Sequence, residues 1–416
     1  MWEWRRAARG PAATRAAGEY GPRLRVMRIV TDDEGPARQA AVLAEGLPAE
    51  LFEQRVYGPR GGTSDPAARH LPGLGRTAGP GGDACALAAL VAEMLRFRPH
   101  IVHTHTARAG TLGRVAALLA GVPARVHSFP GHPAHGHAGG GRAALLAERV
   151  LARVSDRLVT PAARIRDDLI AAGVGRPGRY AVVPPGIRPR PLPGRAHARH
   201  LLGLPDGPPV VAYVGPLTGA ARPDRLVEVL RRIHRALPEV RFAVCGEGEL
   251  LGEVLAAVPG LGGTLHPLGR RDDVESVYAA ADLLLLTSDT EGVPAALIEA
   301  GMAGLPVVAP RVGGVPEVVR HEETGLLAPP WARELAAHAI RLLRDEPARL
   351  RMGAAARAWT TERFAAGRLV ADIRRLYTAI AVERGWWPPS ALAEAVGKEG
   401  AERAAVTGPP GGGERG

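Results

Sequence analysis

Short apolar runs alternate with helix-like segments along most of the chain, and this alternation stops once and then begins again. The runs have the length and composition of buried strands, and the segments between them repeat at helical spacing. Repeated strand–helix–strand order predicts a parallel sheet with helices on both faces. The predicted strands are 24–30, 100–105, 124–129, 156–160 and 179–184, then 209–215, 240–246, 282–288 and 305–310. The predicted helices are 109–121, 142–153, 161–172, 223–237 and 274–281.

The interruption is rich in proline and glycine, which indicates a linker between two such units. We therefore expect an α/β fold with two Rossmann-like, doubly wound domains that face a cleft. Open α/β sheets bind ligands at the carboxyl ends of their strands, and the cleft is the expected site. The predicted division is an N-terminal tail (1–22), a first domain (23–186), a linker (187–208), a second domain (209–366), a helix that crosses back to the first domain (367–387) and a disordered tail (388–416).

The charge of the chain favours anionic partners. Its formal net charge is +11 at pH 7, and this excess suits nucleotide phosphates, nucleic acid or an acidic membrane face. Aromatic residues make up only 4% of the chain, and no basic run is interleaved with them. A nucleic-acid partner that stacks bases is therefore not expected.

Location and cysteine chemistry follow from what the sequence lacks. No apolar run approaches the ~18 residues of a membrane span, and the basic N-terminus has no apolar core of a signal peptide. We expect a cytoplasmic protein. Cys85 and Cys245 each lie inside an apolar run, far apart in sequence, which predicts two buried free thiols rather than a disulfide or a zinc site.

The stretch TSDTEGVPAALIEAGMAG (287–304) carries the most chemistry. It begins where a strand ends, and Pro294 suits the first turn of the helix that follows. Gly292 lets the backbone approach a ligand closely, and the free N–H groups of Val293 and Ala295 with the helix dipole form an anion site suited to a diphosphate. Glu291 lies on the loop, and Glu299 lies about one turn into the helix. The alternative is that the two glutamates are a loop acid and a helix-face acid with no shared role, but the strand–Glu-Gly-x-Pro–helix context favours a site.

These residues resemble family four of the retaining glycosyltransferases, which have the GT-B fold. The resemblance rests on the Glu-x7-Glu pair and on the turn formed by Gly313, Gly314, Pro316 and Glu317, and it extends over about residues 24–384. It implies a UDP- or GDP-linked sugar as donor substrate, with no metal and no cofactor. The implied acceptor is a glycan, a lipid-linked sugar or a small molecule.

The resemblance also implies roles for individual residues. Glu291 would act at the transferred sugar as a catalytic residue, and Glu299 would bind the ribose hydroxyls. His132, beside Gly131, is the other catalytic candidate, as a residue that could contact the substrate. The other implied donor-binding residues are Gly292, Val293, Pro294, Ala295, Gly215, Arg222, Gly246, Glu247 and Arg270. A front-face mechanism that retains the anomeric configuration is the expected route.

Several positions depart from the family pattern where a diphosphate would bind. Pro216 and Ala221 stand where the family usually has an arginine and a lysine, and Pro130 stands where it usually has a histidine. Arg222 and Arg225 are close enough in sequence to substitute for the lost cations. Two hypotheses follow: an active glycosyltransferase with rearranged phosphate contacts, or a degenerate GT-B scaffold that binds a nucleotide or a partner protein without transfer.

Other patterns have plainer interpretations. His103 and His105 alternate on one strand, so they share a face, and a role in packing is expected. A metal site among the histidines of HSFPGHPAHGH (127–137) is the alternative to a flexible acceptor loop. The arginines of helix 223–237 are predicted to form a solvated face. Trp2, Trp4 and the arginines near them suggest peripheral contact with an anionic membrane on its inner face.

Overall fold

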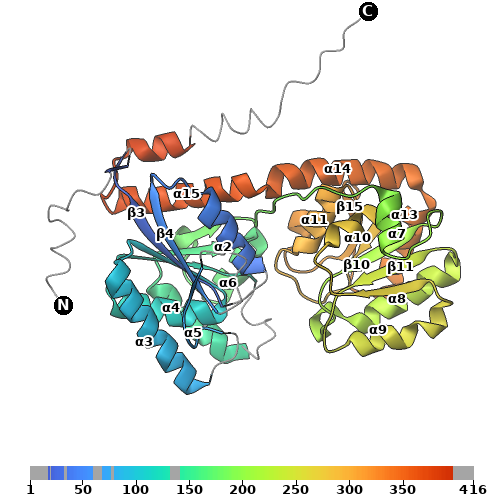
Figure 1. Cartoon of the computed structure of the whole chain (residues 1–416), viewed down its shortest axis with the longest axis horizontal. Helices are drawn as coiled ribbons and strands as arrows, with labels where there is room; N and C mark the ends of the chain where they lie inside the picture. The colour runs from blue at the N-terminus through green and yellow to red at the C-terminus, as the bar shows by residue number, and fades with distance from the viewer. Residues whose placement is uncertain are drawn as a thin grey trace, which may run out of the picture. The chain divides into compact units, whose positions relative to one another are not determined.

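The computed structural model describes residues 17–18, 20–31, 35–59, 68–75, 79–131 and 141–396. Two large parallel sheets carry the fold (Figure 1). The first sheet has the order β5-β4-β3-β6-β7-β8-β9, with strands Arg69–His70, Phe52–Gly58, Leu24–Ile29, Ile101–His105, Ala124–Ser128, Arg157–Thr160 and Tyr180–Val182. The second has the order β12-β11-β10-β13-β14-β15, with strands Leu265–Gly269, Arg241–Cys245, Val210–Val214, Leu283–Leu285, Val307–Pro310 and Gly325–Ala328.

In each sheet the first long strand lies in the interior, and the order in which the chain adds strands reverses beside it. The reversal falls between β3 and β6 in the first sheet and between β10 and β13 in the second. This reversal is the topological switch point of a doubly wound sheet, where open α/β proteins bind their ligands. The predicted α/β class with two Rossmann-like sheets is therefore confirmed.

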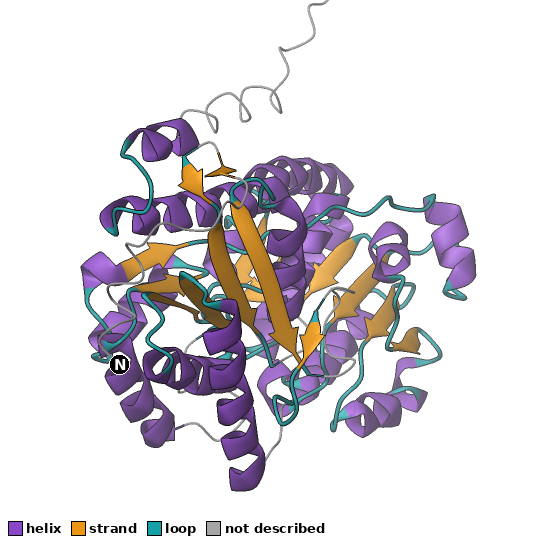
Figure 2. Cartoon of the chain, turned by 60° about the vertical axis from the view of Figure 1, so that its left-hand side comes forward, coloured by secondary structure: helices purple, strands orange, loops and turns teal. Residues whose placement is uncertain are grey.

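Helices connect the strands and cover the sheets, as the purple and orange elements of Figure 2 show. Those of the first half are α2 (Gly35–Gly46), α3 (Pro80–Phe97), α4 (Ala107–Leu119), α5 (Gly141–Arg153), α6 (Ala163–Ala171) and α7 (Arg195–Leu201). Those of the second half are α8 (Pro223–Ala236), α9 (Leu251–Ala257), α10 (Val274–Ala280), α11 (Ala295–Ala303), α12 (Val315–Val318), α13 (Ala332–Arg344), α14 (Glu346–Phe364) and α15 (Ala366–Glu383). No helix in the described residues is both long and apolar enough to cross a membrane.

The chain divides into two compact units. Unit 1 consists of Met1–Ser128, Val154–Arg157 and Val370–Gly416, and unit 2 consists of Phe129–Arg153 and Leu158–Leu369. The units therefore do not coincide with the two sheets, because β9 and most of β8 group with unit 2. The predicted domain boundaries stay a prediction.

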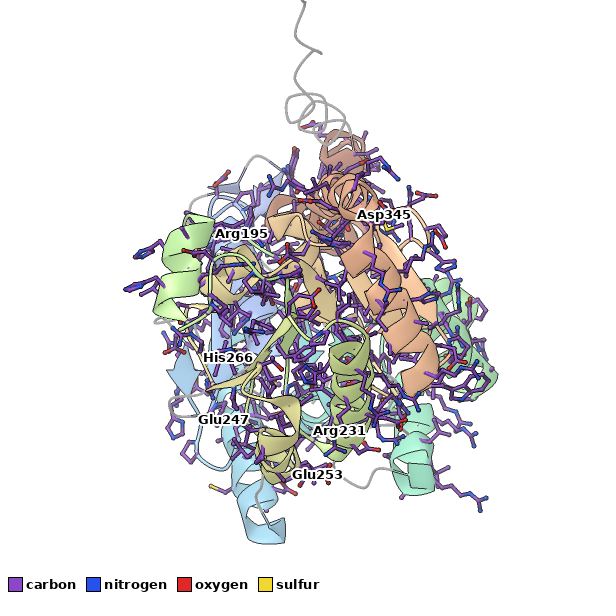
Figure 3. All side chains as sticks on the ribbon, turned by 90° about the vertical axis from the view of Figure 1, so that its right-hand side faces the viewer. Arg195, Arg231, Glu247, Glu253, His266 and Asp345 are labelled. Carbon is purple, nitrogen blue, oxygen red and sulfur yellow. The ribbon has the colours of Figure 1, made fainter. Side chains whose placement is uncertain are left out.

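The second sheet is buried on both faces. Along β10, Val211 and Tyr213 belong to one hydrophobic cluster, whereas Val210 and Ala212 belong to another on the opposite face. Alternate residues of a strand point to opposite faces, so a nearly continuous apolar run is what a two-sided core requires. Many charged side chains of the covering helices are exposed, and Figure 3 labels two of these, Arg231 on α8 and Glu253 on α9.

The predicted linker contains a helix, α7, which the sequence analysis did not place. Two other expectations from the sequence are wrong in part. The predicted disordered tail is helical at 390–396, where Ala391 and Ala395 are buried. Cys245 is buried but Cys85 is exposed, although both are free thiols. On α3 the buried positions include 86, 90, 94 and 97, so helical spacing turns residue 85 away from the core.

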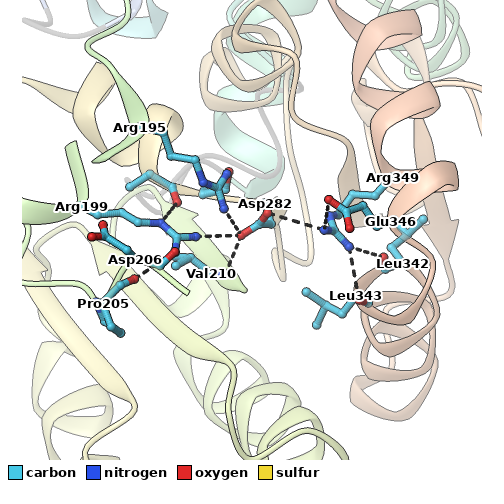
Figure 4. Close-up of polar contacts among 12 residues, drawn as sticks. Arg195, Arg199, Pro205, Asp206, Val210, Asp282, Leu342, Leu343, Glu346 and Arg349 are labelled. Atoms are coloured by element: carbon cyan, nitrogen blue, oxygen red, sulfur yellow. Dashed lines mark hydrogen bonds and ion pairs between the residues drawn. The ribbon is translucent and has the colours of Figure 1, made fainter. Parts of the chain in front are cut away.

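The helix α7 is held to the second sheet by Asp282, immediately before β13 (Figure 4). Its carboxylate accepts bonds from Arg199 at 3.1 Å, from Arg195 at 2.8 Å and from the backbone N–H of Val210 at 2.9 Å, and Arg349 of α14 lies 3.7 Å away. The Arg199 side chain is only 1% exposed. One carboxylate therefore joins α7, β10, β13 and α14.

Histidines of β6 have the structural role expected from the sequence. His103 is fully buried and bridges the Tyr377 hydroxyl and the Ser128 hydroxyl, each at 2.7 Å. Its ring lies 4.2 Å from that of His105, centroid to centroid, so the two share a face as predicted. Burial, followed by the charge of Arg28, lowers the pKa of His105 to about 3, which keeps this imidazole neutral at neutral pH.

Candidate functional site

Glycines lie at or just beyond the carboxyl ends of β10, β11 and β12, so no side chains cover the backbone there. A Cβ atom on Gly246 would lie 1.9 Å from the carbonyl oxygen of Gly215, and one on Gly248 would lie 2.3 Å from that of Leu217. Gly246 donates its N–H to the carbonyl of Gly269 at 2.9 Å. Only glycine permits backbones to approach this closely, so these positions are required by packing as well as available to a ligand.

Polar side chains stand beside this glycine-lined edge. Glu247 and Arg270, both predicted donor-binding residues, directly follow Gly246 and Gly269, and both are exposed. Glu247, labelled in Figure 3, also anchors its turn, because its carbonyl accepts the N–H of Leu217 at 2.9 Å. The structure thus brings four predicted residues, Gly215, Gly246, Glu247 and Arg270, to one edge of the sheet.

Glu291 lies on the loop that follows β13, and its carboxyl is largely withdrawn from water. Burial raises its pKa above the usual value, and a hydrogen bond from Ser288 partly opposes this. The pKa of Tyr213 on β10 is also raised, first by burial and then by the charge of Glu291. Glu291 therefore lies near the end of β10, within electrostatic reach of the glycine-lined edge.

The loop at Glu291 is locked by the Gly313–Gly314 turn. Gly314 donates its N–H to the carbonyls of Gly292 at 2.8 Å and of Glu291 at 3.3 Å. Gly313 has a φ of +48°, and a Cβ there would lie 1.8 Å from the Glu291 carbonyl oxygen. A Cβ on Gly292 would meet the carbonyl oxygen of Pro130 at 2.3 Å. The Glu291–Gly292 loop and the Gly313–Gly314 turn, both prominent in the sequence, therefore contact each other through their backbones.

Helix α11 begins immediately after this loop. Pro294 is its N-cap, one position earlier than the sequence predicted, and no side-chain hydrogen bond caps this end. Val293 packs against the hydrophobic clusters below it. Uncapped N–H groups and the helix dipole favour an anion here, as expected from the sequence.

Glu299 lies one turn into α11 and is oriented by a residue that sequence analysis missed. The buried Tyr278 on α10 donates its hydroxyl to Glu299 Oε2 at 2.8 Å. Burial, then the charge of Glu299, raises the pKa of Tyr278, so the phenol remains a donor. A tyrosine in an ordinary amphipathic helix gave no signal of this contact.

The two arginines expected to replace missing phosphate cations are already paired. Arg222 forms bonds of 2.7 and 2.8 Å with Asp224 and of 2.9 Å with Asp289, and Arg225 contacts Asp289 at 2.5 Å. The hydrogen bond from Arg222 is the largest effect on Asp224 and lowers its pKa to about 2. Because two carboxylates match two guanidinium groups, this cluster carries little net charge.

Arg225 was predicted to be solvated, and that prediction is wrong. Its side chain is 8% exposed, and it donates to the carbonyl of Thr287 at 2.6 Å. Arg225 also forms an ion pair with Asp289, a residue that sequence analysis did not single out. Pro216 is exposed, whereas Ala221 is buried and its carbonyl accepts the Thr287 hydroxyl at 2.9 Å. Ala221 is therefore a packing residue here.

His132 lies outside the described residues, as do His135 and His137. His127 is described and buried, and its Nδ1 lies 2.9 Å from the Thr104 hydroxyl. Burial, then the charge of Arg114, holds its pKa well below the usual range. Nowhere in the described part of the chain do three His, Cys, Asp or Glu side chains gather as metal ligands would.

Comparison with solved structures defines the class of fold. HepE from Anabaena, solved in complex with UDP and glucose, superposes with a TM-score of 0.73 at 20% identity, covering 85% of this chain and 99% of its own. Its similarity confirms the predicted GT-B fold, in which two Rossmann-like sheets are joined in one chain.

Sequence comparison identifies the family. Residues 34–186 match the glycosyl transferase 4-like domain, and residues 195–359 match the glycosyl transferases group 1 model. A D-inositol 3-phosphate glycosyltransferase from Kineococcus radiotolerans is 30% identical over 355 residues, which are 73% of this chain and 80% of that protein. The chain belongs to the group 1 glycosyltransferases, as the sequence motifs predicted.

This chain does not span the full length of its relatives. The sulfoquinovosyl transferase SQD2 from Arabidopsis thaliana is 28% identical over 330 residues, which are 76% of this chain. The chain spans 62% of the length of that relative.

Proposed function

We propose that the protein transfers a sugar from a nucleotide-sugar donor to a glycan, lipid or small-molecule acceptor with retention of the anomeric configuration. The locked Glu291 loop between the glycine-lined edge and the start of α11 is the observation that carries this proposal. Such a loop offers backbone N–H groups to a diphosphate and a carboxylate to the adjoining sugar. Family membership points to the same chemistry, in polysaccharide or glycolipid synthesis.

The donor is proposed to lie along the carboxyl edge of the second sheet. Glu299, held by Tyr278, accepts hydrogen bonds from the ribose hydroxyls, and the backbone of Gly292–Ala295 receives the diphosphate. Gly215, Gly246, Glu247 and Arg270 line the end where the base binds. A uracil or guanine base fits this proposal, and the neighbour HepE is a protein solved with UDP.

The proposed reaction is a front-face substitution at the anomeric carbon. The bond from that carbon to the diphosphate oxygen breaks, the acceptor hydroxyl oxygen forms the new bond on the same face, and its proton passes to the departing diphosphate. Glu291 orients the sugar and stabilises positive charge that develops at the anomeric carbon. His132 is a further proposed contact to the sugar.

One observation favours the alternative of a binding scaffold without transfer. Arg222 and Arg225 are compensated by Asp224 and Asp289, and Pro216 supplies no cation, so the leaving diphosphate depends on the start of α11 for stabilisation. Loss of one well-placed donor typically costs ~10²–10³ in rate. Purified protein incubated with UDP- and GDP-sugars separates the two: measurable donor hydrolysis or transfer supports the enzyme, and binding without any turnover supports the scaffold.

Donor binding is expected to stabilise the protein against heat. A ligand at 100 times its Kd stabilises the native state by about 2.7 kcal/mol, so UDP, GDP or one of their sugars should raise the Tm by several degrees. Substitution of Glu299 with glutamine should remove most of this shift, whereas Glu253→Gln on exposed α9 should leave it unchanged. A panel of nucleotides that shifts neither the wild type nor the Glu253→Gln variant would contradict the proposed donor site.

We further propose that the protein is cytoplasmic and contacts an anionic membrane through α5. The N-terminal residues first expected to do so, including Trp2 and Trp4, lie outside the described residues. On α5 the apolar side chains of 143, 146, 147 and 150 form an exposed stripe, with Leu146 60% and Val150 52% exposed. Arg142, Arg149 and Arg153 line one edge of this stripe, while the acidic Glu148 of this helix is buried. An exposed apolar stripe with a basic edge is typical of helices that lie on anionic bilayers.

Vesicle sedimentation tests this contact. The wild type should sediment with phosphatidylglycerol vesicles and much less with phosphatidylcholine vesicles. The variant Leu146→Gln/Val150→Gln should lose most of this binding, whereas Leu350→Gln, which changes an equally exposed leucine on α14, should retain it. Equal sedimentation of both variants would exclude α5 as the contact.

A further inference from the structure

Unit 2 contains a cavity, and none of its lining residues belongs to the glycine-lined edge. Its volume is about 350 Å³, and it is lined by Arg164, Gly313, Pro316, Glu317, Arg320, Trp359 and Arg363. Three guanidinium groups and one carboxylate thus surround a space that is large enough for a small ligand. We propose that this cavity binds a compact dianion, namely a phosphate or a phosphomonoester. This proposal goes beyond sugar transfer and does not rest on it.

The indole of Trp359 holds two of the arginines in place. Its Nε1–H donates to the carbonyl of Val318 at 2.9 Å, which fixes the plane of the ring. The guanidinium carbon of Arg320 lies 3.6 Å from the ring centroid, and that of Arg363 lies 5.1 Å away. Stacking uses the face of a guanidinium and leaves its N–H edge available, which is the edge that binds phosphate in a forked geometry.

Glu317, the one carboxylate among the lining residues, already has hydrogen-bond partners. Glu317 Oε1 accepts the N–H of Ala163 at 2.8 Å, so it caps the start of α6, which has no side-chain cap from its own N-cap residue. Its Oε2 pairs with Arg363 at 3.2 Å. Glu317 therefore compensates one of the three arginines and leaves an excess of positive charge around the cavity.

The other two arginines are weakly compensated. Arg320 meets Glu323 at 3.3 Å, but both side chains are at least half exposed, and such surface pairs contribute little. Arg164 directly follows Ala163, whose N–H is bound by Glu317, and the Arg164 side chain is exposed. Arg320 and Arg363 both stack on Trp359, so an anion in the cavity would reduce the repulsion between their guanidinium groups.

The cavity shares a wall with the Glu291 loop. Gly313 lines the cavity, and the same residue lies against the Glu291 carbonyl. The anion would therefore bind on one side of the turn whose other side supports the loop.

Calorimetric titration of the full chain with inorganic phosphate, at constant ionic strength in chloride, tests the proposal. We expect saturable binding that Arg164→Gln and Arg320→Gln each weaken by about tenfold or more, because each removes a charged hydrogen bond. Arg351→Gln, which removes an exposed charge from the same helix as Trp359, should bind as the wild type does. A parallel titration with glycerol 3-phosphate distinguishes the sources: tighter binding than inorganic phosphate indicates a phosphorylated molecule, and equal or weaker binding indicates the free ion.

Crystals soaked in tungstate, a tetrahedral dianion with an anomalous signal, locate the site independently. An anomalous peak among Arg164, Arg320 and Arg363 is expected. No peak there, or unaltered phosphate affinity in Arg164→Gln and Arg320→Gln, overturns the proposal. Because both side chains are exposed, neither variant should unfold the protein, and the nucleotide-induced rise in Tm, where present, should persist in both.

Discussion

Substitution of Glu291 with glutamine is expected to lower the kcat of sugar transfer by about 10²–10³ while changing the KM for the donor much less. The proposed role of this carboxylate is to stabilise charge that develops only as the anomeric bond breaks, and removal of one such group typically has this magnitude. Glutamine keeps the size of the side chain and its hydrogen-bond acceptor, so the variant removes only the charge. Steady-state kinetics with the donor identified by binding provide the measurement.

The same variant should be at least as stable as the wild type at neutral pH. Burial raises the pKa of Glu291 in the folded state, so between the unfolded and the folded pKa values the folded protein holds a proton that the unfolded chain has already released. Stability therefore decreases as pH rises from the unfolded pKa, near 4.5, through the raised folded value, and that loss is complete at higher pH. Glu291→Gln does not ionise and avoids the loss, so its Tm relative to the wild type should be higher at pH 7 than at pH 4.

Two comparisons make this result decisive. Glu253→Gln removes an exposed carboxylate from α9 and should leave both kcat and Tm unchanged. A Glu291→Gln enzyme with kcat within threefold of the wild type would contradict the role assigned to Glu291. A Glu291→Gln protein with strongly reduced Tm would instead indicate a structural role for this carboxylate.

Replacement of Asp282 with alanine is expected to destabilise unit 2 by about 3–5 kcal/mol. Removal of one partner from a buried ion pair leaves the other charge buried and unpaired, and this is among the most costly single changes. Arg199 would keep its charge at 1% exposure, with only the carbonyls of Ala280, Pro205 and Asp206 as acceptors. The Val210 N–H would lose its acceptor and Arg195 would keep only the carbonyl of Ala281, so the attachment of α7 to the sheet should weaken.

Calorimetry can assign this loss to the correct part of the chain. For a unit of this size, the expected destabilisation lowers Tm by roughly 6–20 °C. The transition that moves should be the one that nucleotide raises in the wild type. The matched control is Glu322→Gln, which breaks a pair with Arg341 that has two bonds of 2.8 and 2.9 Å but is about half exposed on both sides. Exposed pairs contribute about 1 kcal/mol or less, so equal losses in the two variants would refute the importance of burial at Asp282.

Much of the fold could be predicted because it depends on local pattern. Apolar runs separated by amphipathic helices require parallel sheets, and the strands at 210–214, 241–245 and 283–285 lie within the predicted ranges. Gly292 was expected to let the backbone approach a ligand, and that stays a prediction; in the structure its open side faces the carbonyl of Pro130.

The features that escaped prediction depend on partners distant in sequence. The helix α7 has no apolar periodicity of its own, and a single carboxylate 83 residues away holds Arg199 in place. Arg225 is buried because Asp289, 64 residues later, pairs with it. Tyr278 lies 21 residues before Glu299 in the sequence and contacts it from a different helix, α10. No propensity scale records such contacts, because they form only after the sheet has assembled.

The hydrogen bonds between the Gly313–Gly314 turn and the Glu291 loop join peptide groups only. Substitutions of side chains around the loop can therefore leave these bonds intact, during evolution or in a mutagenesis library. Recognition of different sugars and acceptors can diversify on such a support, and the two glycines mark the limit of that freedom.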